Sequence, residues 1–314
     1  LKLFETNLTG EFFIMKVEIK YPNQEFFATV SEIDIKCISD DDFLKLEKVI
    51  NSYGVTVIKD QKVNDEHQIE FSKKFGELEI SIGTNTKKEN NPYIKPQISR
   101  ISNVDIRTNE MIPPNDHKVI FDRGNNVWHT DSSFKPIPAK FSILSAREIP
   151  EEGGGTEFID ACYALETWKN NNRKYSLEDI KEAITEHSIV YSRMQNTGDI
   201  FNDKFKTDMP FVKQRLVRTH PYTKRSAFYA GSHCSHIIGW DKDEGRNLIN
   251  EINDWVINSG EIASHKWNSG EVVIWDNRRV QHRGTGFDES KYRRIMHRTT
   301  VAGDKPSYEE HVNI

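Results

Sequence analysis

The chain has 314 residues, which is enough to bury a sizeable hydrophobic core in one large domain or two. The formal net charge of −5 gives no reason to expect nucleic-acid binding, and no run of about 18 apolar residues predicts a membrane span. Three scattered cysteines, an odd number, argue against a disulfide framework and for a reducing, cytoplasmic location.

The sequence favours a single domain with helical insertions, because it contains no internal repeat and no low-complexity tract. We assign this domain to residues 21–314 and interpret residues 1–20 as an N-terminal extension or a cloning remnant. Within the domain, residues 79–126 are polar, irregular and rich in Asn, Lys and Pro. A loop region of that length in a compact domain often forms a lid or a binding loop, which is our interpretation of this segment.

Two helices and a strand are predicted before that loop region. Ser39 is a typical helix N-cap that precedes acidic residues, and apolar residues recur at helical spacing until Gly54, where the helix should end. Residues 55–58 form a run rich in β-branched residues and predict a short strand. Asn64 should cap a second helix, which Gly76 closes.

Residues 128–131, Trp-His-Thr-Asp, form the most informative segment of the chain. His129 and Asp131 are two positions apart, and on a β-strand such side chains point to the same face. One imidazole and one carboxylate on one face provide two ligands of the 2-His-1-carboxylate triad of non-haem Fe(II) oxygenases. Alone, this pair is more often a surface pair or a strand-end turn, so the prediction depends on residues further along the chain.

Short β-type runs recur from residue 127 onward, with helical segments between them. Many short strands bounded by turns predict a sandwich or a barrel, with the helices at its periphery. Strands are expected at residues 141–145, 156–159, 214–218, 226–229, 271–275 and 298–301. Helices are expected at residues 161–170, 176–186 and 243–259.

A third metal ligand is expected far downstream, and His282 can supply it. A basic cluster lies beyond it at residues 293–298. An iron site that uses a dicarboxylate cosubstrate needs a fixed cation, and arginine binds a carboxylate through two parallel hydrogen bonds without losing its charge. Arg294 and Arg298 are four positions apart, so on a strand both could reach one pocket. Without the upstream pair, the cluster would be interpreted as a solvated strand end.

Four segments occur in an order that is specific to one family. They are residues 128–134 (Trp-His-Thr-Asp-Ser-Ser-Phe), 153–158 (Gly-Gly-Gly-Thr-Glu-Phe), 216–220 (Leu-Val-Arg-Thr-His) and 275–278 (Trp-Asp-Asn-Arg). With them the chain resembles the family of taurine dioxygenase and 2,4-dichlorophenoxyacetate dioxygenase, which are Fe(II)/2-oxoglutarate-dependent oxygenases. Further similarities at residues 101–104, 132–134, 138–142 and 282–284 place it nearer the 2,4-dichlorophenoxyacetate branch.

The resemblance implies a mainly β fold with peripheral helices, namely a double-stranded β-helix, or cupin-like jelly roll, with the metal inside. It implies His129, Asp131 and His282 as the iron ligands and the catalytic centre. It also implies 2-oxoglutarate as cosubstrate and dioxygen as oxidant, with succinate and carbon dioxide as coproducts. Because relatives are commonly dimers or tetramers, a homo-oligomer is expected.

The same resemblance suggests which residues bind the organic molecules. Thr156 and Arg294 match positions that hold the distal carboxylate of 2-oxoglutarate. Arg298 matches a position that contacts the anionic group of the prime substrate, and Asn125 matches a polar position of the same pocket. Where taurine dioxygenases carry a substrate-binding histidine, this chain has Glu79, which would repel a sulfonate. We therefore expect a small organic anion other than taurine, with an aryloxyacetate-like carboxylate favoured.

Three alternatives stay open at this point. The chain could be a catalytically silent jelly-roll protein that binds a small acid, a taurine or alkylsulfonate dioxygenase proper, or a zinc hydrolase. Glycines 153–155 lack the Gly-Lys-Ser/Thr ending of a phosphate-binding loop. The remaining histidines that we considered are expected in the core or at the edge of the pocket: His187, His220, His233, His236 and His297.

Overall fold

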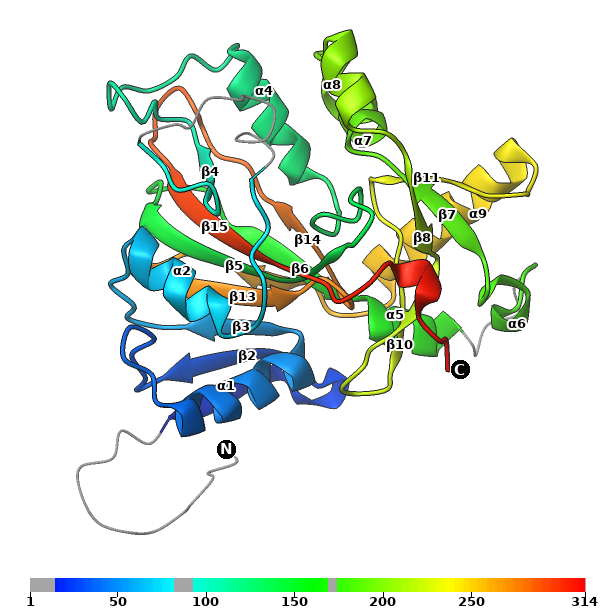
Figure 1. Cartoon of the computed structure of the whole chain (residues 1–314), viewed down its shortest axis with the longest axis horizontal. Helices are drawn as coiled ribbons and strands as arrows, with labels where there is room; N and C mark the ends of the chain where they lie inside the picture. Colours follow the sequence, from blue (N-terminus) through cyan, green and yellow to red (C-terminus); the bar gives the residue numbers. More distant parts are fainter. Residues whose placement is uncertain (1–14, 82–92, 169–173, 314) are drawn as a thin grey trace.

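The computed structural model describes residues 15–81, 93–168 and 174–313. The protein is mainly β, and its largest sheet combines strands from both ends of the chain (Figure 1). Neighbouring strands of this sheet are antiparallel except for β2 and β3, which are parallel. In spatial order the sheet consists of β1 (Lys16–Tyr21), β2 (Phe26–Ser31), β3 (Val55–Ile58), β13 (Val272–Asp276), β5 (Ala139–Glu148), β15 (Ile295–Ala302) and β4 (Ser99–Ser102).

A smaller antiparallel sheet packs against one face of the large sheet. It consists of β12 (Ala263–His265), β6 (Thr156–Asp160) and β14 (Val280–Gly284). Buried apolar side chains from both sheets fill the space between them, and the ring centroids of Phe158 in β6 and Trp275 in β13 are 5.7 Å apart. This layer of packed side chains fixes β14, and therefore His282, against the large sheet.

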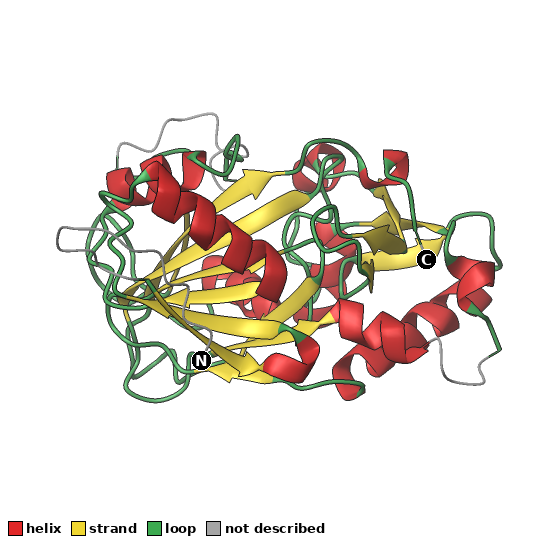
Figure 2. Cartoon of the chain, turned by 90° about the horizontal axis from the view of Figure 1, so that it is seen from below, coloured by secondary structure: helices red, strands yellow, loops and turns green. Residues whose placement is uncertain are grey.

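Two helices cover the other face of the large sheet, α1 (Asp40–Tyr53) and α2 (Asp65–Lys73) (Figures 1 and 2). The Ser39 side chain caps α1 by accepting a hydrogen bond from the backbone of Asp42. Alternate residues of β13 explain the layering, because Val272 and Ile274 face the helices whereas Val273 and Trp275 face the smaller sheet.

The remaining elements gather around a separate hydrophobic cluster beside the two sheets (Figure 1). Its helices are α5 (Ala161–Trp168), α6 (Leu177–Ile180) and α9 (Lys242–Asn258). Its strands are β9 (Val217–Thr219), β10 (Ser226–Phe228) and β11 (Cys234–Ile237). Strand β11 belongs to a three-stranded sheet with β7 (Ile184–His187) and β8 (Val212–Arg215). Three further helices, α4 (His117–Arg123), α7 (Ile189–Thr197) and α8 (Asp203–Asp208), and the 3-10 turns η1 (Pro22–Gln24), η2 (Gly124–Asn126) and η3 (Ser307–Glu309) complete the described elements.

Most of the predicted elements are confirmed, including α1 with its Ser39 cap, β3, and α2 with its Asn64 cap. The helix predicted over residues 176–186 is wrong in its second half, because only Leu177–Ile180 is helical and Ile184–His187 forms β7. This strand pairs with β8 on one side and β11 on the other, so hydrogen bonds on both edges override its helical pattern.

Two predicted segments contain more regular structure than expected. Strand β1 begins at Lys16, inside the range assigned to the N-terminal extension, and pairs with β2. The predicted loop region 79–126 contains β4, α4 and η2, although its residues 82–92 lie outside the described part of the chain. Among the helices that the structure describes, none is long and apolar enough to cross a membrane.

Gln68 connects α2 to the large sheet and provides a test of this arrangement. Its side-chain Nε2 donates to the carbonyls of Ile143 and His297, and its Oε1 accepts from Ser145. We expect Gln68→Leu to lower the free energy of unfolding by about 2–4 kcal/mol, because it removes three hydrogen bonds between α2 and the buried face of the sheet. Urea unfolding measures this, and Glu70→Leu at an exposed position of the same helix should change stability by less than about 0.5 kcal/mol. Equal effects of the two substitutions would contradict the proposed role.

Candidate active site

The two histidines of the predicted metal site lie on adjacent segments of backbone. His129 and His282 form an antiparallel bridge in which each backbone nitrogen donates to the other residue's carbonyl, at 3.0 and 2.9 Å. His129 forms only this isolated bridge, and the chain turns at Ser132, whose φ is +54°. The expectation that His129 and Asp131 share a strand is therefore wrong. A hydrogen bond from the backbone nitrogen of Asp131 to Oδ1 of Asn277 holds Asp131 beside the histidines instead.

Ligand atoms of His129, Asp131 and His282 all lie within 4.8 Å of one another, and all three side chains are buried. The Nε2 atoms of His129 and His282 lie 3.8 and 3.5 Å from oxygens of Asp131. Nδ1 of His129 lies 2.7 Å from the carbonyl of Val127, which fixes the ring and leaves Nε2 as the ligand atom.

Asp131 is held by Arg298 and by two residues, Ser142 and Asn277, whose role the sequence alone did not indicate. Ser142 donates to one carboxylate oxygen at 2.7 Å, and Arg298 donates to the other at 2.5 Å. Asn277 accepts from the backbone nitrogen of Asp131 and donates to the hydroxyl of Ser142 at 2.9 Å. The segment Trp275-Asp276-Asn277-Arg278 carried part of the family resemblance, but only the fold brings its asparagine to Asp131.

The electrostatics of the three residues fit a divalent metal. Burial lowers the pKa of His129 to about 4 and the pKa of His282 well below its usual value, so both rings are neutral. Burial alone would raise the pKa of Asp131, but the charge of Arg298 and a hydrogen bond from Ser142 hold it below its usual value. Two neutral imidazoles and one carboxylate are the donor set of a non-haem Fe(II) centre.

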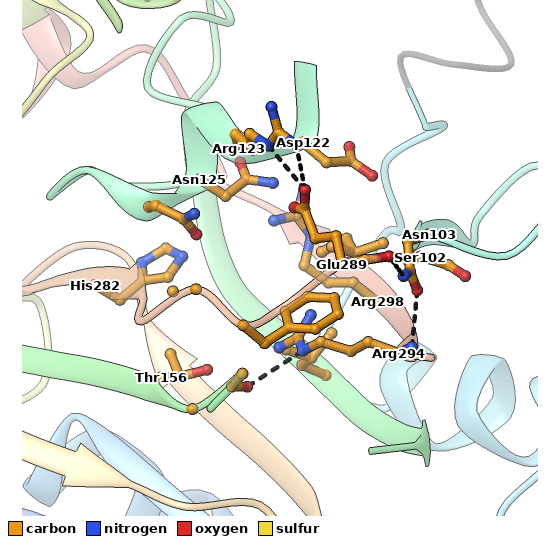
Figure 3. A pocket seen from close by; sticks show the side chains of 18 of the residues that line it. Ser102, Asn103, Asp122, Arg123, Asn125, Thr156, His282, Glu289, Arg294 and Arg298 are labelled. Carbon is orange, nitrogen blue, oxygen red and sulfur yellow. Dashed lines mark hydrogen bonds and ion pairs between the residues drawn. The ribbon is translucent and has the colours of Figure 1, made fainter. Parts of the chain in front are cut away.

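A first cavity opens beside the metal-binding residues and contains the residues predicted for 2-oxoglutarate (Figure 3). Nε of Arg294 donates to the carbonyl of Gly154 at 3.2 Å, and Arg294 has no carboxylate partner among the described residues. Burial lowers the pKa of Arg294 to about 10, so it stays charged at neutral pH. The hydroxyl oxygen of Thr156 accepts from Nε1 of Trp267 at 3.0 Å, which leaves the hydroxyl hydrogen free to donate into the cavity.

Glycines 153–155 have a structural role beside this cavity. Gly154 has a φ of +67°, and a Cβ there would lie 2.6 Å from Cγ of Pro150 and 3.3 Å from Nε of Arg294. The backbone nitrogen of Gly154 donates to the carbonyl of Gly286 at 2.6 Å. The glycines therefore let this loop approach Arg294 and the segment after β14 closely.

A second cavity also reaches His129 and Asp131 and shares Asn125 and Arg298 with the first. Glu79 lies in its wall, where its Oε2 accepts from Ser132 at 2.8 Å and forms an ion pair with Lys135 at 2.6 Å. Lys135 thus balances the negative charge on which the expected repulsion of a sulfonate depended. Oε1 of Glu79 is buried and has no hydrogen-bond partner within the described ranges.

The other histidines lie outside the metal-binding group. His220 contacts Asp276 at 2.8 Å, and His297 contacts Asp65 at 2.7 Å, so both have structural partners. The ring of His233 lies 5.7 Å from that of His129 and lines the second cavity. His187 contacts Thr185 at 3.0 Å in the core, and His236 is only partly buried.

A buried facial set of two histidines and one carboxylate, beside a cavity with an unpaired arginine, defines a class of enzyme: the Fe(II)/2-oxoglutarate-dependent dioxygenases. Comparison with known proteins supports the same class of enzyme. Residues 20–300 match the family described as "Taurine catabolism dioxygenase TauD, TfdA family". The chain belongs to this family.

Two relatives and one solved structure illustrate the similarity. The chain is 31% identical to the alpha-ketoglutarate-dependent 2,4-dichlorophenoxyacetate dioxygenase of Cupriavidus pinatubonensis, over 88% of this chain and 94% of that protein. It is 26% identical to the alpha-ketoglutarate-dependent sulfonate dioxygenase of Saccharomyces cerevisiae, over 96% of this chain and 70% of that protein. The crystal structure of AAD-2 in complex with Mn(II) and N-oxalylglycine matches with a TM-score of 0.81 and 32% identity, over 93% of this chain and 98% of that chain.

Asn277 offers a test of how Asp131 is held. We expect Asn277→Ala to weaken Fe(II) or Mn(II) binding by about 10–100-fold, because residues that orient a metal ligand typically contribute that much to affinity. Metal titration measures this, and circular dichroism establishes that the variant is folded. Asn258→Ala on α9, whose amide only contacts the Asp254 carbonyl, is the matched control. Unchanged metal affinity in Asn277→Ala would show that Asp131 is positioned without it.

Proposed function

We propose that this protein hydroxylates a small organic anion, with Fe(II) as the metal, 2-oxoglutarate and dioxygen as cosubstrates, and succinate and carbon dioxide as coproducts. The observation that carries the proposal is the buried group of His129, Asp131 and His282 at the meeting point of two cavities. One cavity would then hold the cosubstrate and the other the prime substrate. The chemistry of a zinc hydrolase does not require a first cavity in which Arg294 lacks a carboxylate partner among the described residues.

The three grouped side chains would hold the metal by one face and leave three positions for other ligands. When bound there, Fe(II) and 2-oxoglutarate supply the dioxygen activation that hydroxylates the substrate carbon. The protein's own contribution is orientation: Ser142 and Asn277 fix the carboxylate of Asp131. The carbonyl of Val127 fixes the ring of His129.

Arg294 and Thr156 would bind the distal carboxylate of 2-oxoglutarate. Both line the first cavity, together with His129 and His282, so a molecule there could reach the metal and the arginine at once. Arg294 is half-buried and has no carboxylate partner in the described part of the chain, so a bound anion would offset the cost of removing its charge from water. The hydroxyl of Thr156 provides a second donor, since its oxygen already accepts a hydrogen bond from Trp267.

Arg298 and Asn125 would contact the prime substrate, since both line the second cavity as well as the first. A small carboxylate of the aryloxyacetate type is favoured by the similarity to the 2,4-dichlorophenoxyacetate dioxygenase. An alkylsulfonate is the second candidate, because Glu79 is ion-paired with Lys135 and a yeast relative is named for sulfonates. Taurine itself should still bind more weakly than a carboxylate.

We further propose that the two facing sheets form a double-stranded β-helix, within one domain over residues 21–314. The face-to-face packing of β6 and β13 through Phe158 and Trp275 supports this. We also propose that the protein is a homo-oligomer. A location in the cytoplasm is in keeping with the free thiols of the three cysteines.

The function is tested by incubating the purified protein with Fe(II), 2-oxoglutarate and a panel of small acids, and measuring succinate. The panel contains aryloxyacetates, sulfate esters, alkylsulfonates and taurine. We expect iron-dependent succinate formation that an aryloxyacetate stimulates more than taurine does.

His129→Ala, Asp131→Ala and His282→Ala should each abolish succinate formation while the fold is retained, because each removes one of only three proposed protein ligands. Full turnover in any of these variants would refute the ligand assignment, and tightly coupled turnover of taurine would refute the substrate class alone.

Arg294→Ala should raise the apparent constant for 2-oxoglutarate by well over tenfold, because losing a charge-assisted carboxylate contact in a pocket costs about 2–5 kcal/mol. The measurement is succinate formation against 2-oxoglutarate concentration. Arg293→Ala is the matched control, since Arg293 pairs with Glu148 and Asn109 and does not line the first cavity. A larger effect at Arg293 than at Arg294 would move the anchor to the neighbouring residue.

A further inference from the structure

Arg193 on α7 was not singled out by its sequence, yet it lies in the wall of the second cavity. Its side chain is buried, with 3% of the residue exposed. One terminal nitrogen donates to the carbonyl of Gly124 and the other to Oδ1 of Asn125, each at 2.8 Å. The guanidinium is thus held in one place by the turn that precedes the metal-binding segment.

Arg193 has no ion-pair partner among the described residues, although the more distant Asp122 and Asp131 partly offset the effect of burial on its pKa. The other basic residues around this cavity include Lys135, paired with Glu79, and Lys118, paired with Asp122. Arg298 is paired with Asp131. Arg193 has no carboxylate within ion-pair distance among residues 15–81, 93–168 and 174–313, and burial lowers its pKa to about 10, so it stays charged at neutral pH. A buried cation without a counter-ion is costly, and an incoming anion would relieve that cost.

The surrounding chain makes specific room for this arginine. A Cβ at Gly124 would lie 2.3 Å from both Cδ and Nε of Arg193, so only glycine lets the guanidinium lie there. The ring of Phe121 lies 4.9 Å from its Cζ and covers part of it. These contacts restrict Arg193 to one position, as a recognition group requires.

Arg193 also determines what Asn125 presents to the cavity. Because Oδ1 of Asn125 accepts from Arg193, the amide nitrogen of Asn125 is the group left to contact a ligand. Arg193 and Asn125 therefore both offer hydrogen-bond donors. Apolar side chains lie along the same cavity, including Phe134 and Ile189.

We propose that Arg193 is a specificity-determining residue for the prime substrate, and that it binds the carboxylate of a small organic acid together with Arg298 and Asn125. The apolar wall at Phe134 and Ile189 contacts the remainder of that acid. This inference rests on the proposed function, because it takes the second cavity as the substrate cavity. The competing explanation is that Arg193 only ties α7 to the turn at Gly124.

The test measures binding without turnover, on the full chain loaded with Mn(II) and N-oxalylglycine. Phenoxyacetate and its neutral amide, phenoxyacetamide, are titrated by calorimetry into the parent protein, Arg193→Gln and Arg193→Lys. The parent should prefer the acid over the amide. Arg193→Gln should lose roughly tenfold or more of that preference, since a hydrogen bond to a charged group is worth that much. Arg193→Lys should restore part of it, and N-oxalylglycine affinity should stay unchanged.

Arg246→Gln is the matched control, because Arg246 contacts Tyr191 of α7 and lines neither cavity. Arg193→Met, which keeps the length of the side chain without its charge, replaces the glutamine variant if that variant does not fold. Equal weakening of acid and amide would indicate a purely structural tie and overturn the proposal. An unchanged preference for the acid over the amide in Arg193→Gln would also overturn the proposal, and so would the absence of this preference in the parent protein. Because this binding test needs no turnover, absent succinate formation would refute the proposed function and leave the binding result to decide the role of Arg193.

Discussion

The pair of backbone hydrogen bonds between His129 and His282 is the constraint on which the rest of the site depends. It joins the segment before β5 to the strand β14, which the apolar layer between the two sheets holds in place. With these backbones adjacent, oxygens of the Asp131 carboxylate lie 3.8 and 3.5 Å from the Nε2 atoms of the two imidazoles. Main-chain geometry thereby sets the position of a proposed metal site whose residues are far apart in sequence.

Charge compensation distinguishes Arg193 and Arg294 from the arginines that have a structural role. Three buried arginines each have a carboxylate partner: Arg218 pairs with Glu310, Arg278 with Asp276 and Arg279 with Asp160. Arg193 is also buried and Arg294 is half-buried, but neither has such a partner in the part of the chain that the structure describes. Removing an unpaired charge from water is costly, so both arginines raise the free energy of the folded protein. Binding of two anions, one in each cavity, would remove it.

The sequence alone predicted those elements whose signals are local. The Ser39 and Asn64 caps and the apolar spacing behind Ser39 depend only on neighbouring residues, and α1 and α2 form as expected. The segment around β7 shows the opposite case, because its two partner strands, which are distant in sequence, decide its conformation. The site likewise combines features that local sequence predicts with contacts that only distant segments create. His129, Asp131 and His282 could be proposed from a short motif and its order in the chain, and the structure brings them together.

The sequence by itself therefore determined the type of chemistry, because the kinds of ligand and their order along the chain are written in short motifs. The tertiary structure decided which other residues surround that chemistry. Asn277 and Ser142 reach Asp131, Trp267 reaches Thr156, and Arg193 reaches the second cavity, although no spacing rule links any of these pairs. It also decided that Glu79 is balanced by Lys135. Burial and pairing arise only when distant segments pack, so the charge that each cavity presents to a ligand could not be read from the residues alone.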